Sequence, residues 1–365
     1  MIYLNNAATS YPKPPSVVQA MTEALEHAPK SALRSNLTDS DDVLSGLRQQ
    51  LGRLFHINDW NRIFFCSSAT DAINRVLGGL RLSTIEVSRD NHNSVLRPLM
   101  NDTRPRTSHF ALTIVPHCSN VTGEIHNIKR VCQEAHAQGR IVMVDAAQSA
   151  GSIPIDVDGW GVDILVFTGH KALFGPTGTG GYYVRRGIDL RPTQFGGTGR
   201  DSSIIRYEEG DWEYEVGTQN LVGLTGLSAG VAYVLQRGVE NIYHHLLEET
   251  LWLIKALKSI KGVRVYERCD SKGVNTLSLE EESDDEHRGS VVSFNIEGLK
   301  PSDVGYILQN SYNITVRTGL HCAPLIHEDL GTAPLGTVRA SLSCFNTRAD
   351  IETLVDAVSN ITSSL

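Results

Sequence analysis

Two ionisable side chains follow apolar runs of strand length in the middle of the chain. Asp145 comes directly after Ile141–Val144, and Lys171 follows Ile164–Phe167 after a short turn. An ionised carboxylate at the end of a buried strand could keep a pyridine nitrogen protonated, which makes the ring an electron sink. A lysine past the next strand could form a Schiff base with an aldehyde. Alone, Asp145 could be a helix N-cap and Lys171 a solvated loop residue, but the pair favours a pyridoxal cofactor.

A phosphate group on such a cofactor needs backbone N–H groups and hydroxyls, and the sequence offers them at two places. Residues 65–74 have the pattern of a strand, a turn of small residues and the start of a helix. Helix N-termini bind anions, although an ordinary helix cap would explain this segment equally well by itself. Thr168 and His170 flank the lysine turn, and the glycine-rich stretch Gly175–Gly181 follows it.

The elements that must position these groups alternate between strand and helix patterns. This alternation is typical of an α/β unit with a mainly parallel sheet, whose function lies beyond the carboxyl ends of the strands. Residues 221–261 have apolar side chains at helical spacing, and a smaller α+β unit is expected from Val263 onward. The expected strands are Arg62–Phe65, Thr84–Val87, Phe110–Val115, Ile141–Val144, Ile164–Phe167 and Gly180–Val184.

Length and composition fit an enzyme that acts on small molecules. The 365 residues are 41% hydrophobic and 20% charged, enough for two structural units. A net charge of −8 argues against nucleic acid or a phospholipid surface as a partner. Because no apolar stretch approaches the roughly 20 residues of a membrane span and no signal peptide is evident, a cytoplasmic location is expected. The six cysteines lack metal-ligand spacing, so reduced thiols and no metal site are predicted.

Several motifs together resemble the class V aminotransferase-like enzymes, and within them the cysteine desulfurases. The resemblance implies a pyridoxal-phosphate-dependent transferase of fold type I, the aspartate aminotransferase-like fold. It also implies a large domain over 14–240, a small α+β domain made of 1–13 and 241–365, and a homodimer with shared active sites. The motifs are Tyr3–Thr9, the turn at Ser67–Thr70, Asp145–Gln148, Gly169–Lys171, Arg317–Cys322 and Val338–Leu342.

The resemblance also implies a role for each matching position. Lys171 holds the cofactor, His92 stacks on its ring and moves protons, and Cys322 attacks sulfur. Arg34 and Asn6 join Arg339 in binding the substrate. The implied cofactor ligands are Ala69, Thr70, His92, Asn120, Asp145, Gln148, Thr168, His170, Lys171 and, toward the neighbouring subunit, Thr218.

Arg339 and Cys322 connect the cofactor to a substrate. Arg339 could be an ordinary surface arginine, but a planar guanidinium also suits an α-carboxylate, and the resemblance implies that use. Cys322 could be a small buried hydrophobe, yet it follows Arg317 and His321, which can favour a thiolate. The implied reaction converts L-cysteine to alanine and transfers sulfur through a Cys322 persulfide to an acceptor. A protein is one candidate for this acceptor.

Other functions stay open at this point. Cys322 could assist or be idle in a carbon–sulfur or selenocysteine lyase, and an aminotransferase or epimerase would use Lys171 alone. A scaffold in sulfur trafficking would need no cofactor, but the presence of Asp145, Lys171 and Arg339 argues against it.

Overall fold

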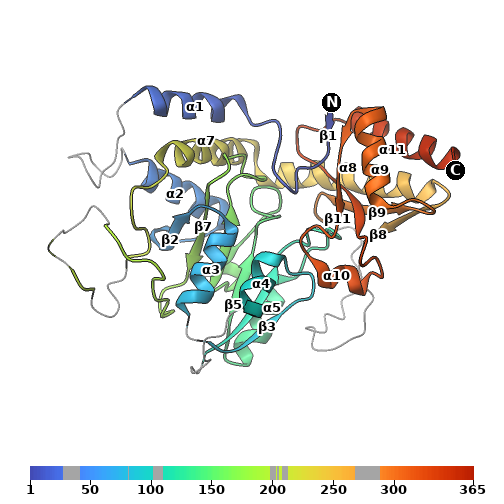
Figure 1. The fold of residues 1–365 in the computed structure, drawn as a ribbon. Helices are drawn as coiled ribbons and strands as arrows, with labels where there is room; N and C mark the ends of the chain where they lie inside the picture. The colour runs from blue at the N-terminus through green and yellow to red at the C-terminus, as the bar shows by residue number, and fades with distance from the viewer. Residues whose placement is uncertain are drawn as a thin grey trace.

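The computed structural model describes residues 1–27, 42–80, 82–101, 110–197, 203, 205–207, 213–267 and 288–365. Two parts are visible in Figure 1, one built on a six-stranded sheet and the other on a four-stranded sheet, with both termini at the second part. A two-stranded pairing of β1 (Ile2–Tyr3) with β10 (Ile314–Thr315) brings the N-terminus to this second part. The division of the chain at residues 13 and 240 stays a prediction.

The six-stranded sheet has the order β2-β7-β6-β5-β4-β3. β3 to β6 run parallel to one another, and only β7 is antiparallel to its neighbours β2 and β6. This confirms the predicted α/β class with a mainly parallel sheet. The strands are β2 Ile63–Cys66, β3 Leu82–Val87, β4 Phe110–Pro116, β5 Arg140–Asp145, β6 Ile164–Thr168 and β7 Gly180–Val184.

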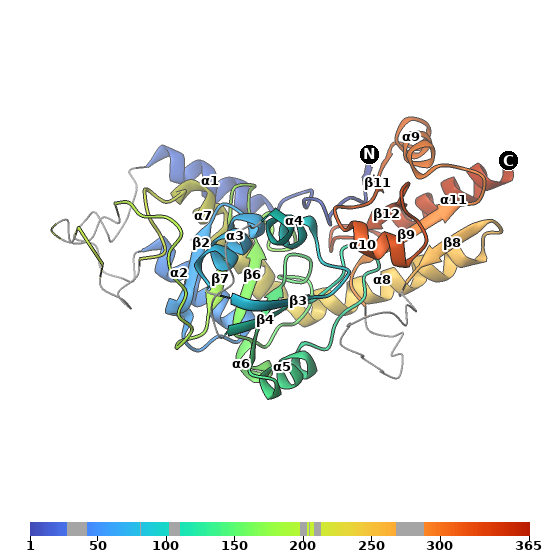
Figure 2. The ribbon, with the colours of Figure 1, turned by 60° about the horizontal axis from the view of Figure 1, so that its bottom comes forward.

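Helices cover both faces of this sheet, which explains why its central strands are continuous apolar runs. Along β5, Val142 and Val144 belong to one hydrophobic cluster and Met143 to the other. In Figure 2, α3 and α4 lie on one side of β3 and β4, and α5 and α6 lie on the other. The helices are α1 Pro15–Glu26, α2 Val43–Phe55, α3 Ala69–Gly79, α4 Asn93–Asn101, α5 Ile128–Ala137 and α6 Val157–Trp160, with a 3₁₀ turn at Trp60–Arg62.

The helical connection expected over 221–261 is formed by two helices, α7 (Leu221–Arg237) and α8 (Val239–Ser259). They are separated at Gly238, whose φ of +81° is easily adopted only by glycine. α8 leads into the four-stranded sheet, which has the order β11-β12-β9-β8. The remaining elements are β8 Val263–Tyr266, β9 Val291–Ile296, α9 Pro301–Tyr312, β11 Arg317–Gly319, α10 Pro324–Asp329, β12 Thr337–Ser341 and α11 Arg348–Ser363.

Candidate active site

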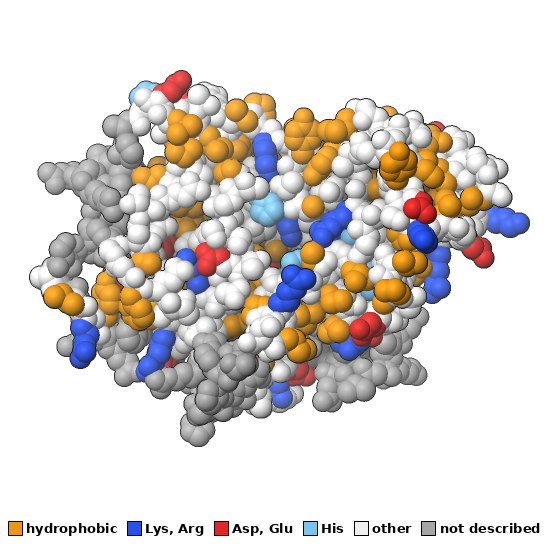
Figure 3. Space-filling view, viewed as in Figure 1, with side chains coloured by type: hydrophobic (Ala, Val, Ile, Leu, Met, Phe, Trp, Pro, Cys, Tyr) orange, Lys and Arg blue, Asp and Glu red, His pale blue; other side chains and the backbone are white. Residues whose placement is uncertain are grey.

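A cavity of about 220 Å³ lies where the carboxyl ends of β5 and β6 meet β11 and β12. On the face shown in Figure 3, histidine, lysine and arginine side chains gather at the middle of the molecule, between its two parts. Most of the predicted site residues line this one cavity. They are Ala69, Thr70, His92, Asn120, Asp145, Gln148, Thr168, His170, Lys171 and Arg339.

Asp145 is buried and Lys171 is half-buried in the cavity wall. Asp145 is the last residue of β5, and its Oδ1 accepts a hydrogen bond from the backbone N–H of Ala147 at 2.9 Å. Burial raises the pKa of Asp145, against the opposing effects of this hydrogen bond and of the Lys171 charge. Burial likewise lowers the pKa of Lys171 to about 8, and the negative charge of Asp145 limits that shift. The two groups are therefore electrostatically coupled, with an amine that deprotonates readily.

The backbone beside Lys171 is held by the N-terminal segment. The His170 carbonyl accepts from the Ser10 N–H at 3.1 Å, the Thr9 hydroxyl at 3.2 Å and Lys13 Nζ at 2.8 Å. The Lys171 carbonyl accepts from Ser10 Oγ at 2.7 Å. Sequence reasoning missed Ser10 and Lys13, because about 160 residues separate them from their partners and no motif links the two segments.

One end of the cavity is suited to an anion. α3 begins there at Ala69, and the first N–H groups of a helix attract negative charge. Two buried side-chain atoms, Thr168 Oγ1 and His170 Nδ1, have no hydrogen-bond partner among the described residues. Unsatisfied buried polar atoms are rare, so these two indicate that a polar group belongs here. The predicted phosphate ligands therefore lie together, with vacant hydrogen-bonding capacity.

His92 is fixed in one orientation at the start of α4. Its Nδ1 accepts from the Ser94 backbone N–H at 3.0 Å and lies 2.9 Å from the Ser94 hydroxyl oxygen. Burial, and then the positive charge of Lys171, lowers the pKa of His92 to about 4. The ring is therefore neutral at pH 7, with its proton on Nε2 because Nδ1 acts as an acceptor.

Asn120 and Gln148 use their amide N–H groups within the chain. Asn120 Nδ2 donates to the His321 carbonyl at 2.7 Å, and Gln148 Nε2 donates to the Ala7 carbonyl at 3.1 Å. Both residues line the cavity, and their contact with a ring hydroxyl, which would use the remaining amide atoms, stays a prediction. The Asn120 contact also joins the six-stranded part to the loop that carries Cys322.

Arg339 is fully buried and has unused donors. Its Nη1 donates to the Asn120 carbonyl at 2.9 Å, but Nε and Nη2 have no partner among the described residues. Burial, and then the charge of Arg317 opposite it in the β11–β12 pair, lowers the pKa of Arg339 to about 9. A buried cation with two free donors is the arrangement that a carboxylate would complete.

Cys322 lies next to Arg317, whose Nη2 donates to the cysteine Sγ at 3.0 Å. A cationic donor at sulfur is typical of reactive cysteines. His321 and Cys322 both have left-handed backbones, with φ of +49° and +63°. The Cys322 carbonyl accepts from the Asn93 N–H at 2.6 Å, and Cys322 is within electrostatic reach of Lys171 and Arg339.

The other described cysteines differ from Cys322. Cys118 lines the cavity wall, but burial raises its pKa to about 12. Burial also raises the pKa values of Cys66 and Cys132 to about 12, and it raises the pKa of Cys344. Burial therefore favours the protonated thiol at all four positions.

Four predicted residues are not among those that line the cavity. Cys322 is one of them, although it contacts the lining residue Arg317. The other three lie elsewhere. Arg34 is outside the described residues, and Thr218 is exposed in the segment before α7 and does not line the cavity. Asn6 is buried beside the cavity, but its Nδ2 donates to the Ser341 carbonyl at 3.0 Å and its Oδ1 accepts from the Tyr11 N–H at 3.2 Å. Its amide thus fixes the N-terminal segment, and its contact with substrate stays a prediction.

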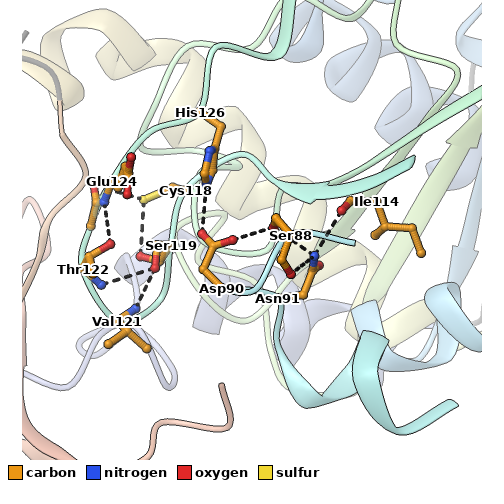
Figure 4. Close-up of polar contacts among 11 residues, drawn as sticks. Ser88, Asp90, Asn91, Ile114, Cys118, Ser119, Val121, Thr122, Glu124 and His126 are labelled. Atoms are coloured by element: carbon orange, nitrogen blue, oxygen red, sulfur yellow. Dashed lines mark hydrogen bonds and ion pairs between the residues drawn. The ribbon is translucent and has the colours of Figure 1, made fainter. Parts of the chain in front are cut away.

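A second acidic residue in the cavity wall was missed by sequence reasoning. Asp90 is buried and accepts from the Ser88 hydroxyl at 2.5 Å, and its Oδ2 lies 2.8 Å from His126 Nε2 (Figure 4). Its burial opposes ionisation, but the interaction with His126 and the two hydrogen bonds hold the pKa of Asp90 below its usual range. Two carboxylates, Asp90 and Asp145, therefore face a cavity that also holds three cationic side chains, Lys171, Arg317 and Arg339.

No group of His, Cys, Asp and Glu side chains within the described ranges could hold a metal ion. In the same part of the chain, no helix has the length and apolar character needed to cross a membrane.

Comparison with known proteins agrees with this geometry. The family model for aminotransferase class-V matches residues 2–102 and 79–354, so the chain belongs to this family. A probable cysteine desulfurase from Methanothermobacter thermautotrophicus is 30% identical over 397 residues, covering 99% of this chain and 94% of that protein. A protein named cysteine desulfurase from Pectobacterium atrosepticum is 26% identical and covers 99% of this chain and 93% of its own length.

Solved structures show the same likeness. An apo cysteine desulfurase from Thermococcus onnurineus NA1 superposes with a TM-score of 0.84 and 29% identity, covering 100% of this chain and 95% of that one. The cysteine desulfurase CsdA from Escherichia coli, in an S-sulfonic acid form, gives a TM-score of 0.81 and 26% identity, with coverage of 100% and 95%. The predicted fold type and the predicted resemblance are therefore confirmed.

Proposed function

We propose that this protein is a pyridoxal-phosphate-dependent cysteine desulfurase. The observation that carries the proposal is the position of Cys322, which accepts a hydrogen bond from Arg317 and is electrostatically coupled to Lys171 and Arg339. An amino-acid enzyme that used Lys171 alone would not require a thiol at this place. The names of the related proteins support the same activity.

The residues of the cavity fit pyridoxal phosphate. The N-terminus of α3 at Ala69 and the unpartnered Thr168 Oγ1 and His170 Nδ1 suit the phosphate. Asp145 suits the protonated ring nitrogen, and the neutral ring of His92 suits stacking on the pyridine. When bound, the cofactor would supply the electron sink that makes the α-proton of an amino acid acidic.

The side chains then have separate tasks. Arg339 binds the substrate carboxylate through Nε and Nη2, which orients the amino acid in one plane. Lys171 Nζ takes the α-proton and returns a proton, a task that suits an amine with a pKa of about 8. Asp145 keeps the ring nitrogen protonated throughout.

Cys322 completes the reaction at sulfur. Its thiolate bonds to the substrate sulfur while the bond from that sulfur to the substrate β-carbon breaks, and the β-carbon keeps the electron pair and takes a proton. L-Cysteine and the thiol thus give L-alanine and a Cys322 persulfide, with no external oxidant or reductant. The outer sulfur then passes to an acceptor thiol, for which a carrier protein is one candidate.

The proposal includes a homodimer, which the family resemblance implies, and a cytoplasmic location, which the sequence predicts. In this dimer the exposed Thr218 would reach the phosphate in the neighbouring subunit. The large domain would span 14–240 and the small one 1–13 with 241–365, and Asn6 and Arg34 would border the substrate entrance.

Intact mass spectrometry of the purified protein after incubation with L-cysteine tests the proposal. Wild type is expected to gain the mass of one sulfur atom and release alanine, and Cys322→Ser to gain none. Cys132→Ser, which removes a buried thiol of α5, is the matched control and should behave as wild type. Lys171→Ala should lose the visible absorbance of the bound cofactor. Conversion of cysteine to pyruvate, with no added sulfur on Cys322, would contradict the proposal and favour a lyase.

A further inference from the structure

The turn that connects β3 to α4 is held rigidly by its own polar contacts (Figure 4). Asn91 Nδ2 donates to the Ser88 carbonyl at 3.0 Å and to the Ile114 carbonyl of β4 at 3.1 Å. The Ser88 hydroxyl donates to Asp90, whose other oxygen lies 2.8 Å from His126 Nε2. Side chains that project from this turn therefore have a fixed base.

Arg89 projects from this turn to the end of α10. Its Nε lies 2.9 Å and 2.7 Å from the two carboxylate oxygens of Asp329, and its Nη2 donates to Glu328 at 3.1 Å. The Asp329 side chain is only 13% exposed, so water screens this pair less than an ordinary surface ion pair. The contact joins the six-stranded part of the molecule to the segment that follows Cys322.

α10 begins at Pro324, two residues after Cys322, so the position of the helix limits the conformation of the cysteine. Cys322 and His321 have left-handed backbones, which residues with a Cβ atom resist. Contacts outside the loop must therefore keep them there. The Asn93 N–H and the Asn120 side chain bind the Cys322 and His321 carbonyls on one side.

We propose that Arg89 is a positioning residue that fastens α10 and so keeps Cys322 in the conformation that places its sulfur next to Arg317, a residue of the cavity wall. The stretch from Arg89 to Asn93 holds Cys322 twice, once through the Asn93 N–H and once through α10. The expected effect on catalysis rests on the proposed function of Cys322, whereas the contact of Arg89 with α10 does not depend on that function. A pair that serves stability alone would leave Cys322 unaffected.

Hydrogen exchange and steady-state kinetics of the cofactor-loaded protein separate these cases. Arg89→Gln and Asp329→Asn are each expected to speed amide exchange in the peptide 320–332 about fivefold, and to lower kcat for alanine formation by a similar factor with unchanged KM. The double variant should do no more than either single one, because both changes remove the same pair. Arg89→Lys, which keeps a charge at this position, should recover most of the effect.

The matched control is Arg140→Gln, which breaks a similarly exposed ion pair between Arg140 and Glu86, with its Nη1–Oε2 distance of 2.8 Å, in the six-stranded sheet. It should leave both measurements as in wild type. Unchanged exchange over 320–332 in Arg89→Gln would overturn the proposal. Faster exchange with unchanged kcat would overturn the positioning role. If the protein formed no alanine at all, the proposed function would fail, while the exchange result would still judge the fastening.

Discussion

Replacing Arg339 with methionine should make the substrate-free protein more stable while it removes activity. Arg339 is fully buried, with two guanidinium nitrogens that lack partners among the described residues. Burial lowers its pKa from 12.5 to about 9. At about 1.4 kcal/mol for each pH unit, this corresponds to roughly 5 kcal/mol of stability lost by keeping the side chain charged at pH 7. Since the folded-state pKa lies below the unfolded one, the loss is complete below pH 9 and is relieved as the pH rises from 9 toward 12.5.

Methionine has a similar length and no charge, so Arg339→Met is expected to raise the free energy of unfolding by about 1–4 kcal/mol, as buried ions replaced by apolar side chains often do. The loss of a charge-assisted grip on the substrate carboxylate should lower kcat/KM for L-cysteine at least about 100-fold. Urea unfolding of the cofactor-loaded protein without amino acid measures the first effect, and alanine release measures the second.

Arg288 is the matched control, because it is also a buried arginine but is paired with a carboxylate. Its Nη1 donates to Glu267 at 3.0 Å and its Nη2 donates to the Thr122 carbonyl. Arg288→Met should therefore lower the free energy of unfolding, by about 3 kcal/mol or more. If Arg339→Met lost as much stability as Arg288→Met, the charge of Arg339 would be compensated in the substrate-free protein, which would refute the prediction.

Three further predictions concern the groups around the cavity. Burial, opposed by the charge of Asp145, lowers the pKa of Lys171 to about 8. The rate of pyridoxal phosphate uptake, measured by stopped-flow absorbance, should therefore rise about tenfold per pH unit up to pH 8 and then level off. A rate that does not change between pH 6 and 9 would contradict this. Lys13→Met removes a donor from the His170 carbonyl and should weaken cofactor retention in dialysis about fivefold, whereas retention equal to wild type would show that Ser10 suffices. Asp163 is a fully buried carboxylate outside the cavity that accepts from the Val142 N–H and pairs with His136 and Arg185. Asp163→Asn should therefore lower the free energy of unfolding, measured in urea, by about 3–5 kcal/mol and leave the activity per folded molecule unchanged. A smaller loss would mean that the amide keeps these contacts.

The central strands could be predicted to within a residue or two, and the reason is physical. β5 and β6 are covered by helices on both faces, so after Arg140 at the start of β5 every position is apolar until a polar residue at the carboxyl end, Asp145 or Thr168, marks the cavity. The direction of β7 had no such signal. Its Gly180 and Gly181 admit the close approach of Ser68 and the Phe167 ring, but such contacts are settled by packing between distant segments.

The site divides in the same way. Asp145, Lys171 and the turn at Ala69 follow strands, so a parallel sheet brings them together without further information. Two other contacts depend on how loops pack, and spacing along the chain does not encode them. They are the hydrogen bond of Ser10 to the Lys171 carbonyl and the contact of Asp90 with His126. Motif likeness placed Asn6 with the substrate, whereas its observed hydrogen bonds hold the N-terminal segment.

The charges of the cavity wall favour the binding of two anionic groups. Lys171, Arg317 and Arg339 bring three basic groups to its wall, and the charge of Asp90 is already met by His126. Among the described residues that line the cavity, only Asp145 remains to balance them, and a protonated pyridine nitrogen would occupy that carboxylate. Cofactor phosphate at Ala69 and substrate carboxylate at Arg339 would supply the missing negative charge, each where unpartnered donors already point. An amino acid without its carboxylate should therefore bind far more weakly than L-cysteine, and cysteamine is the compound that tests this.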